Sequence, residues 1–192
     1  ALYGTPAGAS LGKVTPRLTL AYRRWIEASR FFVIASVGAE DVDCSPRGDV
    51  PGELIEIVDD ETILVPDRRG NNRLDTLRNL VRDPRCSLLF LIPGVFETLR
   101  VKGRAQVAAD EALRARFDVA GRRPATVIVL RIEAVYFQCA RALMRSELWA
   151  EASVVDPQTV PSAGEMTRSG DPAFDAAGYD AALRPRQRDS LY

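Results

Sequence analysis

Histidine is absent from the 192-residue chain. Without an imidazole the chain cannot build a Ser-His-Asp or Cys-His nucleophile, and it lacks the usual nitrogen ligand for metals. The three cysteines, Cys44, Cys86 and Cys139, are too few and too scattered for a disulfide framework or a zinc cluster. We therefore expect no metal site, and if the protein is an enzyme, something other than histidine supplies the reactive centre.

The chain also lacks an excess of either charge and any long apolar run. Its 26 basic and 26 acidic residues cancel, so no overall field attracts DNA or RNA, and an anion site must be local. No stretch approaches 18 unbroken apolar residues, and the first residues do not resemble a signal peptide. We expect a soluble, cytoplasmic protein that binds neither nucleic acid nor a membrane.

Composition divides the chain into three parts. Residues 1–15 are small and rich in Gly and Pro, which is typical of an arm. Residues 16–149 carry periodic apolar patterns and form the single folded domain that this length predicts. Residues 150–192 turn to Ser, Pro, Gly, Asp and Arg, which indicates an extended tail that orders by wrapping its own surface or a partner's.

The periodicities within the domain favour a mainly β fold with flanking helices. Alternating apolar residues predict strands, a 3.6-residue apolar period predicts helices, and Pro46 places the second strand at an edge. Tight turns between most strands indicate a closed or partly closed antiparallel barrel of six or seven strands. The predicted strands span 31–38, 42–49, 54–58, 62–66, 86–93, 97–110 and 125–139, and the predicted helices span 17–30, 71–83, 110–117 and 140–149.

The most informative stretch lies between the fourth strand and the second of these helices. Pro66, Asp67, Arg68, Arg69 and Gly70 lead into a helix expected to begin near residue 71 or 72. A helix N-terminus presents unpaired N–H groups and a partial positive charge, and here the three arginines of residues 68–73 crowd it. The stretch therefore predicts a phosphate site, although Asn71 as a simple helix cap beside solvated arginines is the plain alternative.

Three further stretches carry weaker signals. Ser45 and Arg47 follow an apolar strand and are suited either to a ligand edge or to an ordinary turn. Thr98 opens a long strand on the face opposite Leu99. A last group could stack on an anionic ring system or equally pack at an oligomer interface; it lies on one predicted helical stripe and comprises Arg141, Arg145 and Trp149.

Taken together, residues 17–150 resemble the pyridoxamine 5′-phosphate oxidase-like family of FMN-binding split β-barrels. The resemblance lies in the order and the sequences of four segments: FFVIASVG, VDCSPRGD, ILVPDRRGNNRLDTLRNLVRDPRCSLLFLIPG and ETLRVKGRAQV. The family's NPR-S-L-L-F motif corresponds here to DPRCSLLF at residues 83–90. The resemblance implies a split-barrel fold, FMN as cofactor, and a homodimer with FMN at the interface.

The resemblance also implies which residues hold the cofactor. The strand along the flavin ring falls on residues 44–47, and the family's adjacent Arg-Lys phosphate pair falls on Asn72 and Arg73, so that Arg68 or Arg69 must replace one cation. Arg141, Arg145 and Trp149 are then candidates for reaching the flavin or substrate from the second protomer. Together with the loop, the expected cofactor-binding set is Cys44, Ser45, Pro46, Arg47, Val65, Pro66, Arg68, Asn71, Asn72, Arg73 and Thr98.

The departure from the family concerns the substrate. The C-terminal segment with which true pyridoxamine phosphate oxidases bind substrate, including an Arg and a His, is not recognisable, which disfavours vitamin B6 oxidation. The expected function is an FMN-dependent oxidoreductase that moves a hydride or electrons between a reduced nicotinamide and an unknown small molecule. The alternatives are a non-catalytic flavin carrier or sensor and a deazaflavin-dependent reductase of the same fold.

Overall fold

A computed structural model describes residues 2, 4–5, 8–50 and 52–192. Its strands are β1 (Phe31–Val37), β2 (Val42–Gly48), β3 (Glu56–Ile57), β4 (Thr62–Pro66), β5 (Arg85–Leu91), β6 (Thr98–Ala108) and β7 (Val127–Gln138). Its α-helices are α1 (Gly8–Gly12), α2 (Leu20–Glu27), α3 (Asp75–Arg82), α4 (Glu111–Ala115), α5 (Arg141–Arg145), α6 (Ala163–Gly170) and α7 (Ala176–Asp189). Two 3-10 turns, Glu151–Ser153 and Pro157–Thr159, precede α6.

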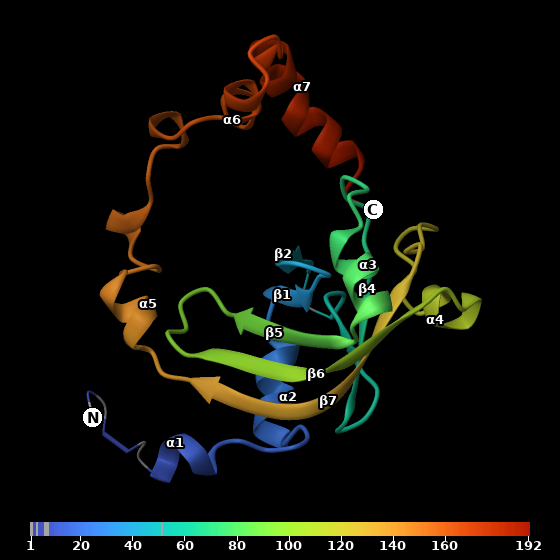
Figure 1. Ribbon diagram of the computed structural model, residues 1–192, viewed down its shortest axis with the longest axis vertical. Helices are drawn as coiled ribbons and strands as arrows, with labels where there is room; N and C mark the ends of the chain where they lie inside the picture. Colours follow the sequence, from blue (N-terminus) through green and yellow to red (C-terminus); the bar gives the residue numbers. More distant parts are fainter. Residues whose placement is uncertain (1, 3, 6–7, 51) are drawn as a thin grey trace.

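The strands form one seven-stranded antiparallel sheet in the order β2-β1-β5-β6-β7-β4-β3. The described residues show no pairing between the edge strands β2 and β3, so the curved sheet is not closed. Figure 1 shows β5, β6 and β7 side by side and α2 and α3 against the sheet. The predicted fold class, a mainly β protein with six or seven antiparallel strands and flanking helices, is confirmed.

Alternation along β1 and β5 builds the centre of the core. Every second side chain of each strand is buried, and Phe32 and Phe90 meet with their ring centroids 5.0 Å apart. Both rings are fully buried, so each contributes about 1.5–3 kcal/mol of apolar transfer free energy. β2 alternates only between exposed and half-buried positions, as an edge strand does, and its Pro46 confirms the edge prediction.

β4 is buried on both faces. Ile63 and Val65 point into the main core, while Leu64 packs with Phe117 and Val127 in a second, smaller cluster. The short helix α4 and the start of β7 supply that second layer. A strand covered on both sides is held in a fixed position, and the loop that follows β4 therefore begins from a rigid support.

Several predicted elements are shorter than expected. α2 begins after Thr19, whose hydroxyl caps it, and β3 keeps only two residues. The helix expected over 140–149 is the five-residue α5, and Glu147 beyond it has a positive φ of 48°. The predicted arm holds the single turn α1, with residues 1, 3, 6 and 7 outside the described part. The tail, expected to be extended, contains α6 and α7.

None of the helices in the described residues is long and apolar enough to cross a membrane.

Gly103 allows an irregularity in the pairing of β6 with β7. The pairing of β6 with β7 shifts register between Lys102 and Gly103. A Cβ atom at residue 103 would overlap the backbone carbonyl of Arg131 on the neighbouring strand. The bulge thus requires glycine because no side chain fits between these two backbones.

We expect Gly103→Ala to destabilise the protein by about 1–3 kcal/mol, because overpacking against a backbone must be relieved by moving one strand. Urea unfolding followed by far-UV circular dichroism measures the change. Gly70→Ala is the matched control, since its added Cβ would meet nothing and should change the free energy of unfolding by less than about 0.5 kcal/mol. Equal effects of the two substitutions would contradict the role of the bulge.

Candidate functional site

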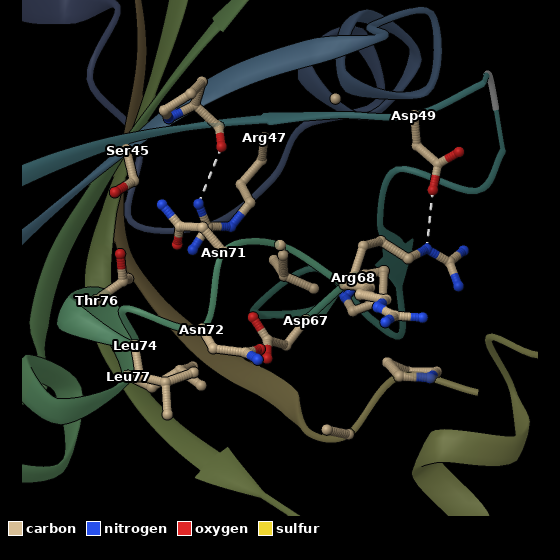
Figure 2. Close-up of a pocket in the computed structure, with 18 of the residues that line it drawn as sticks. Ser45, Arg47, Asp49, Asp67, Arg68, Asn71, Asn72, Leu74, Thr76 and Leu77 are labelled. Carbon is tan, nitrogen blue, oxygen red and sulfur yellow. Dashed lines mark hydrogen bonds and ion pairs between the residues drawn. The ribbon is translucent and has the colours of Figure 1, made fainter. Parts of the chain in front are cut away.

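One pocket of about 1060 Å³ opens beside β2, and four parts of the chain line it. The second half of β2 forms one wall, and the loop between β4 and α3 forms the opposite wall (Figure 2). Residues 122–125, just before β7, and the residues around Asp189 and Tyr192 complete the lining. Antiparallel pairing of β4 with β7 explains the third segment, because Pro66 lies opposite Val127.

Nine of the eleven expected cofactor-binding residues line this pocket. The two that do not are Cys44 and Thr98. Alternation along β2 turns the exposed Cys44 side chain away from the face that carries Ser45, and Thr98 is buried at the start of β6 opposite Gln138. The nine are Ser45, Pro46, Arg47, Val65, Pro66, Arg68, Asn71, Asn72 and Arg73.

The helix expected to begin at residue 71 or 72 begins at Asp75 instead. Asn72 and Leu74 both have φ of 61°, in the left-handed region, and Leu74 as N-cap offers no side-chain hydrogen bond. Asn71 accepts a hydrogen bond from the backbone N–H of Arg73 at 3.1 Å, so it shapes a turn rather than capping the helix. A leucine in this conformation costs about 1–2 kcal/mol, and such backbone strain concentrates at ligand-binding loops.

Asp43 ties β2 to the first turn of α3. One of its carboxylate oxygens accepts hydrogen bonds from the hydroxyls of Thr76, at 2.8 Å, and Ser45, at 3.0 Å. A turn further along α3, the buried Asn79 side chain donates to Ser36 of β1 at 3.1 Å. These contacts fix the distance between the two main walls of the pocket.

Arg68 is committed to the protein itself. Its guanidinium pairs with Asp49 at 2.9 Å and Glu53 at 3.3 Å, and it also donates to the backbone carbonyl of Phe117 at 2.7 Å. The side chains of Arg68 and Asp49 are only 14% and 3% exposed. Arg68 therefore holds the pocket wall together, and each of its three guanidinium nitrogens already donates a hydrogen bond within the protein (Figure 2).

Arg47 is a half-buried cation of the pocket with no carboxylate in contact. Its guanidinium donates a hydrogen bond to the backbone carbonyl of Pro46 at 2.9 Å. In the described part of the chain Arg47 forms no ion pair. Burial lowers the pKa of Arg47, with Asp67 and Asp43 acting in the opposite direction. Burial likewise raises the pKa of Asp67, against the effect of Arg47 and of a hydrogen bond from Thr126. Two partly desolvated charges thus face the pocket without satisfying each other.

Arg73 lies at the rim of the pocket. Its side chain is 76% exposed and pairs with Asp75 at 2.8 Å. The hydrogen bond to that carboxylate raises the pKa of Arg73. An exposed pair of this kind contributes little to stability, so Arg73 can exchange Asp75 for another anion at little cost.

The three residues proposed to act from a second protomer lie outside the pocket of their own chain. Arg141 and Arg145 are exposed on α5. Trp149 was expected on the same helical stripe, but α5 ends before it, and its indole N–H donates to the carbonyl of Val95 in the β5–β6 loop at 2.8 Å. The prediction that Arg141, Arg145 and Trp149 share one helical stripe is therefore wrong.

Sequence reasoning missed several polar residues of the pocket, of which five are central to its structure. Asp43, Asp67 and Thr76 stand within or next to recognised motifs, but nothing in their spacing shows that their side chains converge. Arg122 and Tyr192 are distant in sequence, and only the pairing of β4 with β7 and the path of the tail bring them here. In the described residues no group of three Cys, Asp or Glu side chains could hold a metal ion.

Comparison with known proteins adds the family to this geometry. The family model for pyridoxamine 5′-phosphate oxidase matches residues 18–139. A search of the curated proteins found no match. Among solved structures, HupZ of Group A Streptococcus is similar with a TM-score of 0.51 and 14% sequence identity, over 62% of this chain and 93% of that chain.

A further solved structure is the protein related to general stress protein 26, of the pyridoxinephosphate oxidase family, from Clostridium acetobutylicum. Its TM-score is 0.48 at 11% sequence identity, over 62% of this chain and 86% of that chain. At such identities HupZ supports the fold alone.

We expect Arg68→Met to lower the free energy of unfolding by about 3–5 kcal/mol, because it leaves the buried Asp49 without its counterion. The next residue provides the control. Arg69 is exposed and has no ion pair in the described part of the chain, so Arg69→Met should cost less than about 0.5 kcal/mol. Chemical unfolding of the two variants tests the difference, and equal stability would show that Arg68 does not brace the wall.

Proposed function

Because the chain belongs to the pyridoxamine 5′-phosphate oxidase family, we propose that it binds FMN in the pocket between β2 and the β4–α3 loop. The observation that carries the proposal is Arg47, a half-buried cation without an ion pair in the described residues, on the wall of a pocket of about 1060 Å³. A buried charge is costly unless an opposite charge approaches it. An anionic ligand supplies that charge.

The lining fits the parts of FMN. Hydrogen-bond donors for a phosphate come from Arg47, Arg73 and the side-chain amides of Asn71 and Asn72. Apolar surface for a flavin ring comes from Pro46, Val65, Pro66, Leu54, Leu74 and Leu77. The pocket volume is that of a small-molecule site.

The proposal revises how the phosphate is held. Arg68 was expected to replace the family's second phosphate cation, yet its donors already serve Asp49, Glu53 and Phe117. Arg47 is the better partner for Arg73, because burial strengthens its attraction for an anion while Arg73 gives up only an exposed ion pair. Asn72 then contributes an uncharged donor between them.

The carboxylates in the pocket oppose an anion, and most are engaged elsewhere. Asp43 accepts two hydroxyl hydrogen bonds, Asp49 is paired with Arg68, and Asp75 is paired with Arg73. Asp67 and Asp189 remain, and Asp67 is the one of the two whose charge acts on Arg47. Burial raises the pKa of Asp67. Asp67 is therefore the residue that competes most directly with a phosphate for Arg47.

We propose further that the protein is an oxidoreductase of small molecules and a homodimer. A bound flavin supplies the transfer of a hydride or of electrons from a reduced nicotinamide, while this chain binds and orients it. Support for a second copy comes from the segment 144–166, where six large apolar side chains are exposed: Met144, Leu148, Val154, Val155, Val160 and Met166. Exposed apolar surface gathered on one segment is typical of an interface.

We expect Arg47→Met to weaken FMN binding about 10- to 100-fold, since it removes a charge-assisted contact while keeping the apolar stem. Arg73→Ala should weaken it in the same direction, and Asp67→Asn should strengthen it by removing the competing carboxylate. Quenching of flavin fluorescence on titration measures all three affinities.

Riboflavin, which lacks the phosphate, is the control ligand. Its affinity should be unchanged by these substitutions, because they act on the phosphate end of the site. Sedimentation equilibrium should give twice the 21.1 kDa chain mass for each variant, as for the parent protein. A parent protein that does not take up FMN would overturn the proposal, and an unchanged FMN affinity in Arg47→Met would place the phosphate elsewhere.

Reduction under air-free conditions separates an enzyme from a flavin carrier. The carrier is worth testing because the pocket contains no histidine and most of its carboxylates are already engaged. For an oxidoreductase, NADH or NADPH should bleach the absorbance of bound FMN, and air should restore it. Bound FMN that neither nicotinamide reduces, although dithionite does, would instead favour the carrier.

A further inference from the structure

The tail leaves the sheet after β7 and returns to it at Tyr192. Trp149 anchors its first part on the β5–β6 loop through the hydrogen bond to Val95. Beyond that, α6 and α7 pack against each other, and Asp180 of α7 accepts from the backbone N–H of Gly164 at 2.8 Å. Figure 1 shows the tail as an arc that ends beside α3 and β4.

Three different contacts hold Tyr192 at this point. Its hydroxyl donates to Asp49 at 2.6 Å, its ring lies 5.3 Å from the guanidinium carbon of Arg68, and its backbone oxygen accepts from Arg122 at 3.0 Å. Arg68 binds the other carboxylate oxygen of Asp49. Tyr192 is therefore attached to the ion pair that braces the pocket wall, and to the segment that precedes β7.

Tyr192 forms part of the wall of the pocket and does not fill it. It lines the pocket together with Asp189 at the end of α7, and the volume of about 1060 Å³ remains with the tyrosine in place. The pocket therefore has room for a ligand while Tyr192 is docked. The segment around Tyr192 has few other contacts with the sheet, so it can detach from the pocket and bind again. β2 and the β4–α3 loop, in contrast, are held in place by the core and by Asp43.

We propose that Tyr192 is a positioning residue that docks on Asp49, Arg68 and Arg122 and retains the ligand in the pocket. Rupture of its contacts opens this side of the pocket, and the ligand enters or leaves while the tyrosine is undocked. The inference rests on the proposed function for the identity of the ligand, FMN, but the docking of Tyr192 belongs to the protein without ligand.

Dissociation of FMN is the first test, followed after mixing the loaded protein with excess FMN-scavenging apoprotein. Tyr192→Ala removes both the ring and the hydroxyl and should speed release roughly three- to thirty-fold, as expected for one hydrogen bond to a carboxylate and one cation–π contact. Tyr192→Phe keeps the ring and should lie between this variant and the parent. Leu191→Ala changes the exposed neighbour and should leave the rate unchanged.

Two features distinguish retention from other roles. Riboflavin should also leave Tyr192→Ala faster, because a wall retains any occupant, whereas substitutions of Arg47 act on FMN alone. The association rate should rise as well, because FMN enters through the same opening, so its affinity should change little. Tighter FMN binding with faster association in Tyr192→Ala would show that the tyrosine obstructs the pocket, and unchanged release would show that it does not close it. Either result overturns the proposal.

Docking has a readout that needs no ligand. The hydrogen bond to Asp49 raises the pKa of the Tyr192 phenol. The difference between the alkaline absorbance titrations of the parent and Tyr192→Phe isolates this group, and Asp49→Asn should lower its pKa. An ordinary phenol pKa would show that Tyr192 is undocked and would overturn the proposal, while failure of the parent to bind FMN would overturn the proposed function and leave this titration intact.

Discussion

The ion pair between Arg68 and Asp49 is the interaction on which the architecture of the pocket depends. It joins the end of β2 to the loop after β4, and Arg68 extends the connection to Glu53 and to the carbonyl of Phe117 beyond α4. Both side chains are buried enough that neither tolerates the loss of the other. The walls are thus held before any ligand arrives, and binding does not have to organise them.

The anion site that we propose depends on local pairing, because the chain as a whole carries no net charge. Six arginines and five aspartates line the pocket, so their formal charges nearly cancel. These residues differ in burial and in their ion pairs. Arg68 and Arg73 are paired with carboxylates. Arg47 has no ion pair, and burial lowers its pKa and raises that of Asp67. In this proposal the attraction for an anion is short-ranged, and it depends on the partly buried guanidinium of Arg47.

The strands and their order of appearance follow from the sequence because alternation and turn residues are local signals. Pro46 at an edge was predictable, since its missing N–H group is accepted at few positions of a sheet. The start of α3 was not predictable. Leu74 favours helices by propensity, and only tertiary contacts hold it in a left-handed conformation.

The candidate site was predictable in its segments and not in its details. The loop after β4 and the end of β2 could be chosen from their residue types. That Arg68 faces the protein, that Arg47 is desolvated and that Arg73 is exposed depends on packing between distant segments. Arg122 and Tyr192 could not be found at all, because no local pattern reports that residues 70 positions apart meet.

The composition of the pocket from four separate chain segments has a thermodynamic consequence. The hydrogen bond between Tyr192 and Asp49 alone closes a loop of 143 residues, and an unfolded chain cannot keep these segments together. Any ligand that contacts several of these segments binds only the native state, and by mass action it shifts the folding equilibrium toward that state. The melting temperature therefore reports how fully the pocket is occupied, whether by the FMN that we propose or by another small molecule.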